Sequence, residues 1–424
     1  MKRPAAVLCL AVVLGCLAAR ADETTNAEEI RKLSQIVEEQ GKIIQNLVAR
    51  IAEMESKKTE ADFKKKEDEK KGYSSKWTEK VKVGGGLRYR HERIAETDKP
   101  DRNRHRIKAN LDVTAKVTDD IDVGLSVATG KYEPKAELEQ GQDPASLNQT
   151  LTSGFSSKSV WIDLAYFDWH PSRVSGLHVI GGKMKNPFYA PGSTELIWDG
   201  DLRPEGLAVK FARKWGAFEP FGSAGGFWVR ENSGALDSIL WGVQAGLKFQ
   251  PEESKWYARA GLGYFDFTQA DGAKTFYNTS KSFGNTTSGG RYAYDFREFE
   301  PFIELGTDIG GVPVAVFADW VQNLGAPNGS NTGWLAGATV GKCKDPGSWQ
   351  FRYNYRNIEK DAVVGVFTDS DFRGGGTDGK GSEVGFDYQL TKNVLAGISY
   401  FNNTLGVEGS KEYERLQIDV TFKF

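Results

Sequence analysis

Hydrophobic and polar residues alternate along most of the chain, from Trp77 to Phe424. The final stretch is the clearest case. One face holds Leu416, Ile418, Val420, Phe422 and Phe424, and the other holds Arg415, Gln417, Asp419, Thr421 and Lys423. A period of two is that of a β-strand with one apolar face. A soluble β-sandwich alternates in the same way, so alternation predicts strands without deciding what surrounds them.

Strand and connection lengths favour a membrane barrel. Residues 102–118 alternate for longer than the usual strand of about five or six residues, which suits a tilted membrane crossing. We expect about sixteen antiparallel strands, near 77–92, 102–118, 121–130, 159–170, 177–186, 206–214, 217–230, 238–249, 255–267, 297–308, 312–323, 332–341, 348–359, 382–390, 393–403 and 413–424. Even-numbered strands are followed by short turns, whereas the long connections, 131–158, 187–205, 268–296 and 360–381, follow odd-numbered strands. This asymmetry predicts an all-β transmembrane barrel over 77–424 whose two ends lie at the short-turn rim.

An aromatic residue closes the last predicted strand. A terminal aromatic of this kind is read by the outer-membrane assembly machinery, so Phe424 is the expected assembly signal. Aromatic residues near strand ends are expected to form belts at the membrane interfaces; they include Tyr73, Trp77, Trp256, Trp349, Tyr400 and Tyr413.

A heptad repeat precedes the barrel, within residues 22–56. One seam position holds Ile30, Val37, Ile44 and Ile51, and the other holds Leu33, Gln40, Leu47 and Met54. This pattern predicts an α-helical coiled coil, because so narrow an apolar stripe needs a partner helix. β-Branched residues at the first position favour dimers, although a trimerising barrel could override that preference. An amphipathic helix packed on its own domain is the alternative.

The flanks of this helix have compositions of their own. Residues 1–21 read as a signal peptide, with Lys2 and Arg3 before an apolar run and a small-residue cleavage site at 19–21. A lipoprotein acylated at Cys16 is the competing interpretation. Residues 57–76 form a charged linker in which acids interleave with lysines.

Composition excludes several classes of protein. The mean hydropathy is -0.48, and no run of 18 apolar residues occurs beyond the N-terminus, so the pattern is not that of a helical membrane protein. A formal net charge of -2 gives no reason to expect nucleic acid as a partner. The four histidines stand in no recognisable catalytic or metal-binding motif. We therefore expect no enzyme activity, no cofactor and no metal.

Several motifs resemble the bacterial "putative porin" family. They are Gly181-Gly182-Lys183-Met184-Lys185-Asn186-Pro187-Phe188-Tyr189, the stretch from Leu196 to Gly206, Asn103-Arg104-His105-Arg106, Asp143-Pro144 with Asn148-Gln149-Thr150, and Ala165-Tyr166-Phe167-Asp168-Trp169. The likeness runs from about residue 75 to the C-terminus. It implies an outer-membrane pore with no defined substrate. The plan of coiled coil plus barrel is also similar to that of phosphate-selective porins, but their dense ladder of basic residues is not evident beyond the first two strands.

The expected constriction combines a loop with a basic wall. The 187–205 loop follows the fifth strand, where trimeric porins commonly fold a loop inward, and opposed charges there would orient polar solutes. Its candidate residues are Asp199, Asp201, Arg203 and Glu205, with Lys183 and Lys185 on the strand before it. The wall candidates are Arg88, Arg90, Arg104, Arg106 and Lys108, and we expect Asp199 and Asp201 to face this wall. A surface loop with solvated charges is the alternative.

The predicted function is passive diffusion of small hydrophilic solutes through a water-filled barrel. The partners expected are outer-membrane lipid, further copies of the chain in a homo-oligomer, most simply a trimer, and the assembly machinery. The barrel would lie in the outer membrane of a Gram-negative-type bacterium, with the coiled coil in the periplasm. Two other functions stay open: a channel specific for an anion or a sugar, and a structural or adhesive protein joined to the cell wall through the coiled coil.

Overall fold

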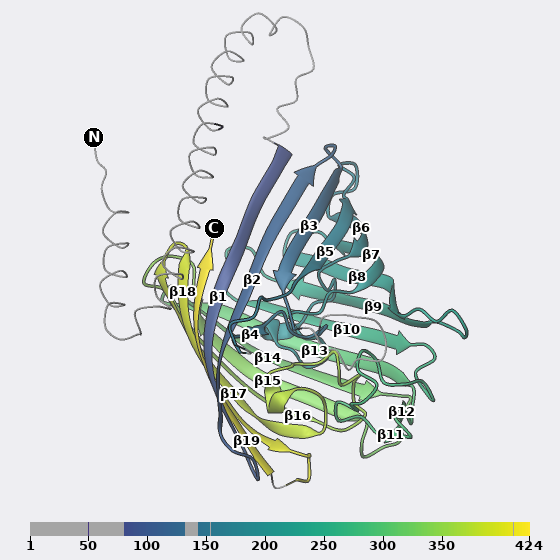
Figure 1. The fold of residues 1–424 in the computed structure, drawn as a ribbon. Coiled ribbons are helices and arrows are strands. Elements are labelled where there is room, and N and C mark those ends of the chain that lie inside the picture. Colours follow the sequence, from purple (N-terminus) through teal and green to yellow (C-terminus); the bar gives the residue numbers. More distant parts are fainter. Residues whose placement is uncertain (1–49, 51–79, 132–142, 153, 410) are drawn as a thin grey trace, which may run out of the picture. The chain divides into compact units, whose positions relative to one another are not determined.

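The computed structural model describes residue 50 and residues 80–131, 143–152, 154–409 and 411–424. Within these ranges sixteen strands form one closed antiparallel barrel (Figure 1). They are β1 (Val81–Glu96), β2 (Arg102–Lys116), β3 (Ile121–Thr129), β5 (Val160–Trp169), β6 (Leu177–Lys183), β7 (Glu205–Ala212), β8 (Phe218–Arg230), β9 (Ser238–Phe249), β10 (Tyr257–Phe267), β13 (Phe296–Ile309), β14 (Val312–Asn323), β15 (Thr332–Gly341), β16 (Trp349–Ile358), β17 (Gly379–Thr391), β18 (Val394–Leu405) and β19 (Lys411–Lys423). The predicted barrel of about sixteen strands is confirmed.

Short elements lie in the connections. β4 (Gln149–Thr150) adds to β2, and β11 (Thr287–Ser288) pairs with β12 (Arg291–Tyr292) in a small hairpin. Two 3₁₀ turns, η1 (Pro191–Ser193) and η2 (Phe372–Gly374), belong to long loops. Among the described residues, no helix has the length and apolar character needed to span a membrane.

The barrel closes between its first and last strands. β19 pairs with β1 in a register that sets Thr421 opposite Arg88 and Gln417 opposite Glu92. Phe424 extends the seam, because its backbone N–H and C=O both bond to Gly85, at 3.1 and 3.0 Å. Closure pairs the strand edges, as a strand surrounded by lipid requires.

The outer surface of the wall is apolar. Exposed side chains include Leu207, Trp241, Leu262, Ile303, Ile398 and Ile418. Ile398 and Ile418 lie directly opposite each other on β18 and β19. Trp256, Trp349 and Tyr400 are also exposed, as expected for interfacial aromatics. Tyr413 is not: it is 3% exposed and faces the lumen, because it shares the inward face of β19 with Arg415. Its placement in an aromatic belt was wrong.

Part of the lumen holds a hydrophobic core made by loops. Three segments, 184–204, 268–295 and 359–378, contribute buried residues such as Trp198, Phe276 and Val363. These pack on inward residues of β7 to β10 and β13 to β16, such as Phe265 and Leu335. We call these three segments the loop plug. The lumen is therefore mainly apolar along one arc of the wall, although this arc also carries buried acids such as Glu298, Glu300 and Asp319. We call the opposite region, around β1, β2 and β19, the polar arc.

The structure does not test the predictions for the N-terminal part of the chain. The signal peptide with Cys16, the coiled-coil seam residues, the linker and the aromatics Tyr73 and Trp77 all lie outside the described residues. The described barrel, taken by itself, is the compact unit that begins at Lys76.

Candidate pore and its charged walls

A cluster of arginines lines the polar arc where β1, β2 and β19 meet. Alternation turns Arg90, Glu92, Arg106 and Arg415 inward, and barrel closure sets β19 beside β1. Glu92 is fully buried and forms ion pairs with Arg104 and Arg415. Arg90 makes a two-pronged pair with Asp419, both bonds at 2.7 Å. The wall is thus a network of charge-assisted hydrogen bonds rather than a row of isolated cations.

The 184–204 connection folds into the barrel, where aromatic packing anchors it. The ring of Phe188 lies 4.8 Å from that of Phe265, and Trp198 lies 5.0 Å from the same ring. Glu304 of β13 accepts hydrogen bonds from the Tyr189 hydroxyl at 2.7 Å and the Gly192 N–H at 2.8 Å. Gly192 has φ of 61°, and a Cβ there would lie 2.3 Å from the Phe317 ring, so only glycine fits.

The two aspartates of this loop face different partners. Asp201 forms an ion pair with Lys108 of β2 and accepts the Leu147 N–H at 3.0 Å. Asp199 is 5% exposed and accepts the Ser370 N–H at 2.9 Å. The expectation that both would face the basic wall was wrong for Asp199, because a second inward loop, 359–378, lies beside it.

This second loop bridges the lumen. Arg356 at its base bonds Asp369 at 2.7 Å and Glu383 at 2.7 Å. At its far side Asp371 accepts from Arg90 at 2.9 Å and Gln417 at 2.9 Å and pairs with Arg415 at 2.7 Å. Asp371 thereby ties the loop to the β1–β19 wall. Sequence reasoning missed it, because this stretch reads as an ordinary acidic loop rich in Gly.

The remaining candidates spread over two regions. Arg88 donates to Asn148 at 2.6 Å, and Arg106 lies 3.4 Å from Ser146 Oγ. Lys183 pairs with Glu205 at 2.6 Å, and Arg203 pairs with Asp163 at 3.2 Å. Lys185 is exposed on the strand side of the loop. The structure therefore brings Arg88, Arg90, Arg104, Arg106, Lys108 and Asp201 to the polar arc, and it leaves Lys183, Lys185, Arg203 and Glu205 near β5 to β7.

Two cavities lie along the polar arc. An outer cavity of about 450 Å³ opens beside the β1–β2 connection, and Ser370 and Arg415 contribute to its lining. An inner cavity of about 340 Å³ lies toward the short-turn rim, and Arg90, Asp371 and Gln417 contribute to its lining. The contacts of Asp371 thus fall between the two cavities.

Three carboxylates meet where the inward loops touch. Oxygen atoms of Glu195, Asp199 and Asp369 lie within 4.8 Å of one another. Burial, and then repulsion by Asp199 and Asp369, raises the pKa of Glu195 well above its ordinary value. Burial, and then Asp201 and Asp369, likewise raises the pKa of Asp199. Oxygen donors of this kind suit Ca²⁺. However, Arg356 already neutralises Asp369. Carboxyl groups that share protons would have the same arrangement.

We expect the contact between the loops to weaken as pH rises through the raised pKa values of Glu195 and Asp199. A carboxyl whose pKa is raised on folding contributes stability below its ordinary pKa, and that stability is lost as pH rises through the raised value. Single-channel recordings should show more current fluctuation as pH rises through the raised pKa values of Glu195 and Asp199. Glu195→Gln, which cannot ionise, should reduce this pH dependence, whereas Glu252→Gln in a short turn should retain it. Identical pH profiles for wild type and Glu195→Gln would contradict the assignment.

A closed sixteen-stranded barrel with an apolar outer surface and a charged lumen is the fold of an outer-membrane channel. The chain belongs to the family described as "Putative porin", whose model matches residues 59–300 and 291–424. This confirms the resemblance found in the sequence motifs. The protein is an outer-membrane porin that allows small solutes to pass by passive diffusion.

The chain is similar to several solved structures. OprB of Pseudomonas putida is similar with a TM-score of 0.53 at 10% identity, over 82% of this chain and 95% of that protein. OmpF of Salmonella typhi in complex with daunomycin has a TM-score of 0.48 at 12% identity, over 81% and 97%. The outer-membrane channel DcaP of Acinetobacter baumannii has a TM-score of 0.47 at 14% identity, over 81% and 97%. No curated protein sequence matches the chain.

Proposed function

We propose that solutes cross this porin along the polar arc of the lumen, between the loop plug and the β1–β2–β19 wall. The observation that carries the proposal is the position of Asp371, which lines the inner cavity while its neighbour Ser370 and its partner Arg415 line the outer one; charged side chains line both cavities. The opposite arc is filled mainly by buried aromatic and aliphatic residues, which leave an unfavourable path for water and ions. Passage by small hydrophilic molecules fits this division.

The constriction would be set by opposed charges. Carboxylates reach it from the loops, at Asp201 and Asp371, and guanidinium groups reach it from the wall, at Arg90 and Arg415. Burial opposes ionisation of Asp371, but Arg415 and Arg90 outweigh it and hold the pKa of that carboxyl well below its ordinary value. Fixed opposite charges across a narrow opening orient dipolar solutes and slow apolar ones.

Assembly and orientation belong to the same proposal. The long loops would face the outside, and both barrel ends the periplasm, which places the coiled coil of residues 22–56 there. The seam residues would hold copies of the chain together, with a trimer as the proposed state.

Thiol labelling tests the path. In a Cys343→Ser background, Ser370→Cys places a thiol in the outer cavity, and Ser172→Cys places one on an exposed short turn. A charged, thiol-specific methanethiosulfonate reagent should lower the KCl conductance of the first variant and leave the second unchanged, because only the first group would narrow the path. Mass spectrometry checks that both variants are completely labelled. If the labelled Ser370→Cys variant then conducts as well as the labelled Ser172→Cys variant, the proposed path is contradicted. An absence of conductance in the folded wild type would contradict the pore function itself.

A further inference from the structure

We propose that the outer cavity is a binding site for small organic solutes that carry two oxyanion groups, carboxylate or phosphate. The proposal rests on the proposed path through the polar arc and adds a preferred class of solute to it. The volume of about 450 Å³ is that of a pocket for a small molecule.

The lining of this cavity is strongly basic. Its cationic residues are Lys99, Arg102, Arg104, Arg106, Lys131, Lys281 and Arg415, against the acidic Glu96 and Asp143. Acids behind the wall offset only part of the excess, because Arg104 and Arg106 share the carboxylate of Glu92, and Arg415 pairs with Glu92 and Asp371.

Arg106 is a buried cation whose hydrogen-bond donors are only partly used. It is 6% exposed, and its Nε has no hydrogen-bond partner among the described residues. Its other contacts are long: 3.4 Å to Ser146 Oγ, 3.4 Å to the Asn148 carbonyl and 3.9 Å to Glu92. A buried guanidinium normally fills its planar donor set with an oxyanion, and a carboxylate or phosphate in the cavity would supply one.

Among the described lining residues, counted by formal charge, the excess of positive charge is confined to the outer cavity. The inner cavity balances Arg88, Arg90, Arg352 and Arg356 with Glu195, Asp369, Asp371 and Glu383. A uniform preference for anions along the lumen would not produce this difference. This distribution of charge indicates a local binding site in front of a neutral passage. Such a site raises the anion concentration at the entrance without trapping anions in the narrow part of the pore.

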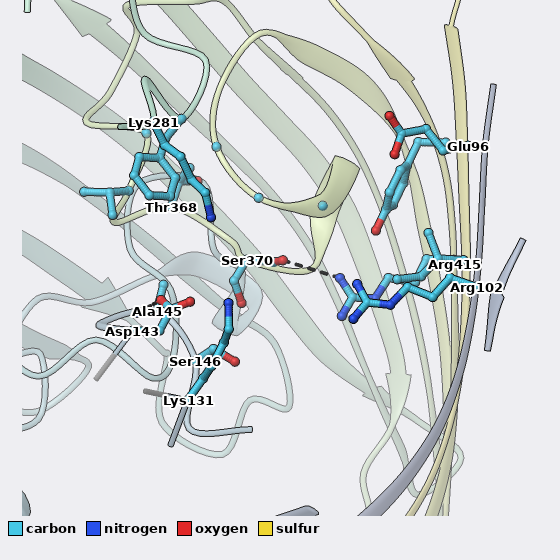
Figure 2. Close-up of a pocket in the computed structure, with 18 of the residues that line it drawn as sticks. Glu96, Arg102, Lys131, Asp143, Ala145, Ser146, Lys281, Thr368, Ser370 and Arg415 are labelled. Carbon is cyan, nitrogen blue, oxygen red and sulfur yellow. Dashed lines mark hydrogen bonds between the residues drawn. The ribbon is translucent and has the colours of Figure 1, made fainter. Parts of the chain in front are cut away.

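The cations approach from two sides, which favours a solute with anionic groups at both ends. Figure 2 shows Arg102 and Arg415 reaching in from the wall, and Lys131 and Lys281 reaching in from the loops on the other side. Figure 2 shows Ser370 between the two sides, and Ser146 and Thr368 on the side of the lysines. One oxyanion would pair with the arginines and the other with the lysines.

Planar-bilayer recording of the full-length porin tests the site. The probes are succinate, with two carboxylates, and pyrophosphate, with two phosphate groups, and sucrose is the neutral control; they are added to the long-loop side at about 0.1 M KCl so that screening stays moderate. We expect each anion to reduce the KCl current in a saturable manner, and sucrose to give no saturation. Saturation by succinate alone would assign the site to carboxylates, and saturation by pyrophosphate alone to phosphates. If neither anion reduces the KCl current in a saturable manner, the proposed binding site is wrong. If the pore still conducts KCl in that case, the proposed path through the polar arc is unaffected.

Matched variants locate the effect. The first triple variant removes three exposed cations of the cavity: Arg102→Gln, Lys131→Gln and Lys281→Gln. The second removes three exposed cations from the short-turn rim: Lys342→Gln, Lys344→Gln and Lys392→Gln. The half-saturating anion concentration should rise about tenfold in the first and stay unchanged in the second, because only the first set contacts the solute. An equal concentration dependence in the two triple variants would overturn the proposal.

Discussion

Replacing Asp371 with Ala is expected to raise the single-channel conductance roughly twofold and to make the open current noisier, because the loop that bridges the lumen would lose its hold on the wall. Asp371 accepts hydrogen bonds from Arg90 and Gln417 of that wall and forms an ion pair with Arg415. The barrel should still fold, since Arg90 keeps Asp419 and Arg415 keeps Glu92. Removal of one partner from a buried charge cluster costs about 3–5 kcal/mol when nothing replaces it, and these remaining pairs reduce that cost.

Two further variants make this result interpretable. Asp101→Ala removes the same charge from the long-loop rim, where Asp101 pairs with the exposed Arg93, and should leave the conductance unchanged. Asp371→Asn keeps the side-chain size and one oxygen acceptor, so it should fall between Ala and wild type. A conductance in Asp371→Ala equal to that of Asp101→Ala would show that the 359–378 loop does not limit the pore.

Deleting Phe424 is expected to abolish most of the folded barrel in the membrane. Two contributions are lost together. The backbone of Phe424 closes the β1–β19 seam through its bonds to Gly85, and its exposed aromatic ring is the proposed signal for assembly. The ring also lies over Gly85, where a Cβ would come within 2.9 Å of it. The folded fraction is measured by the shift in gel mobility on heating.

Substitutions at the same position separate the two contributions. Phe424→Asp keeps the backbone bonds but removes the aromatic ring, and Phe424→Tyr keeps both. If the ring is the signal, the Phe424→Asp variant should assemble as poorly as the deletion variant. The Phe424→Tyr variant should then assemble to the same extent as the wild type. If closure of the seam matters more, Phe424→Asp should fold nearly normally. If the deletion variant folds to the same extent as the wild type, Phe424 is needed neither for closing the seam nor as the assembly signal.

The wall of the barrel could be predicted from the sequence because strand alternation is a local property. A side chain on a strand faces the lumen or the lipid according to its parity, so the inward direction of Arg88, Arg90 and Arg106 followed from counting. The same counting should have placed Tyr413 in the lumen, since it has the parity of Arg415. Predicted strand ends agree with the structure to within a few residues because Gly- and Pro-rich turns interrupt the period.

The contacts across the lumen depend on the tertiary structure. Arg415 and Glu92 are 323 residues apart, and only closure of the barrel with a particular register makes them neighbours. The loops carry no period, so the sequence could suggest that 187–205 folds inward but could not show that 359–378 meets it. That meeting turns Asp199 away from the wall and leaves Asp201 on Lys108. Strand number and side-chain direction were therefore determined by local sequence, whereas the pairing of charges and the filling of the lumen were decided by packing between distant segments.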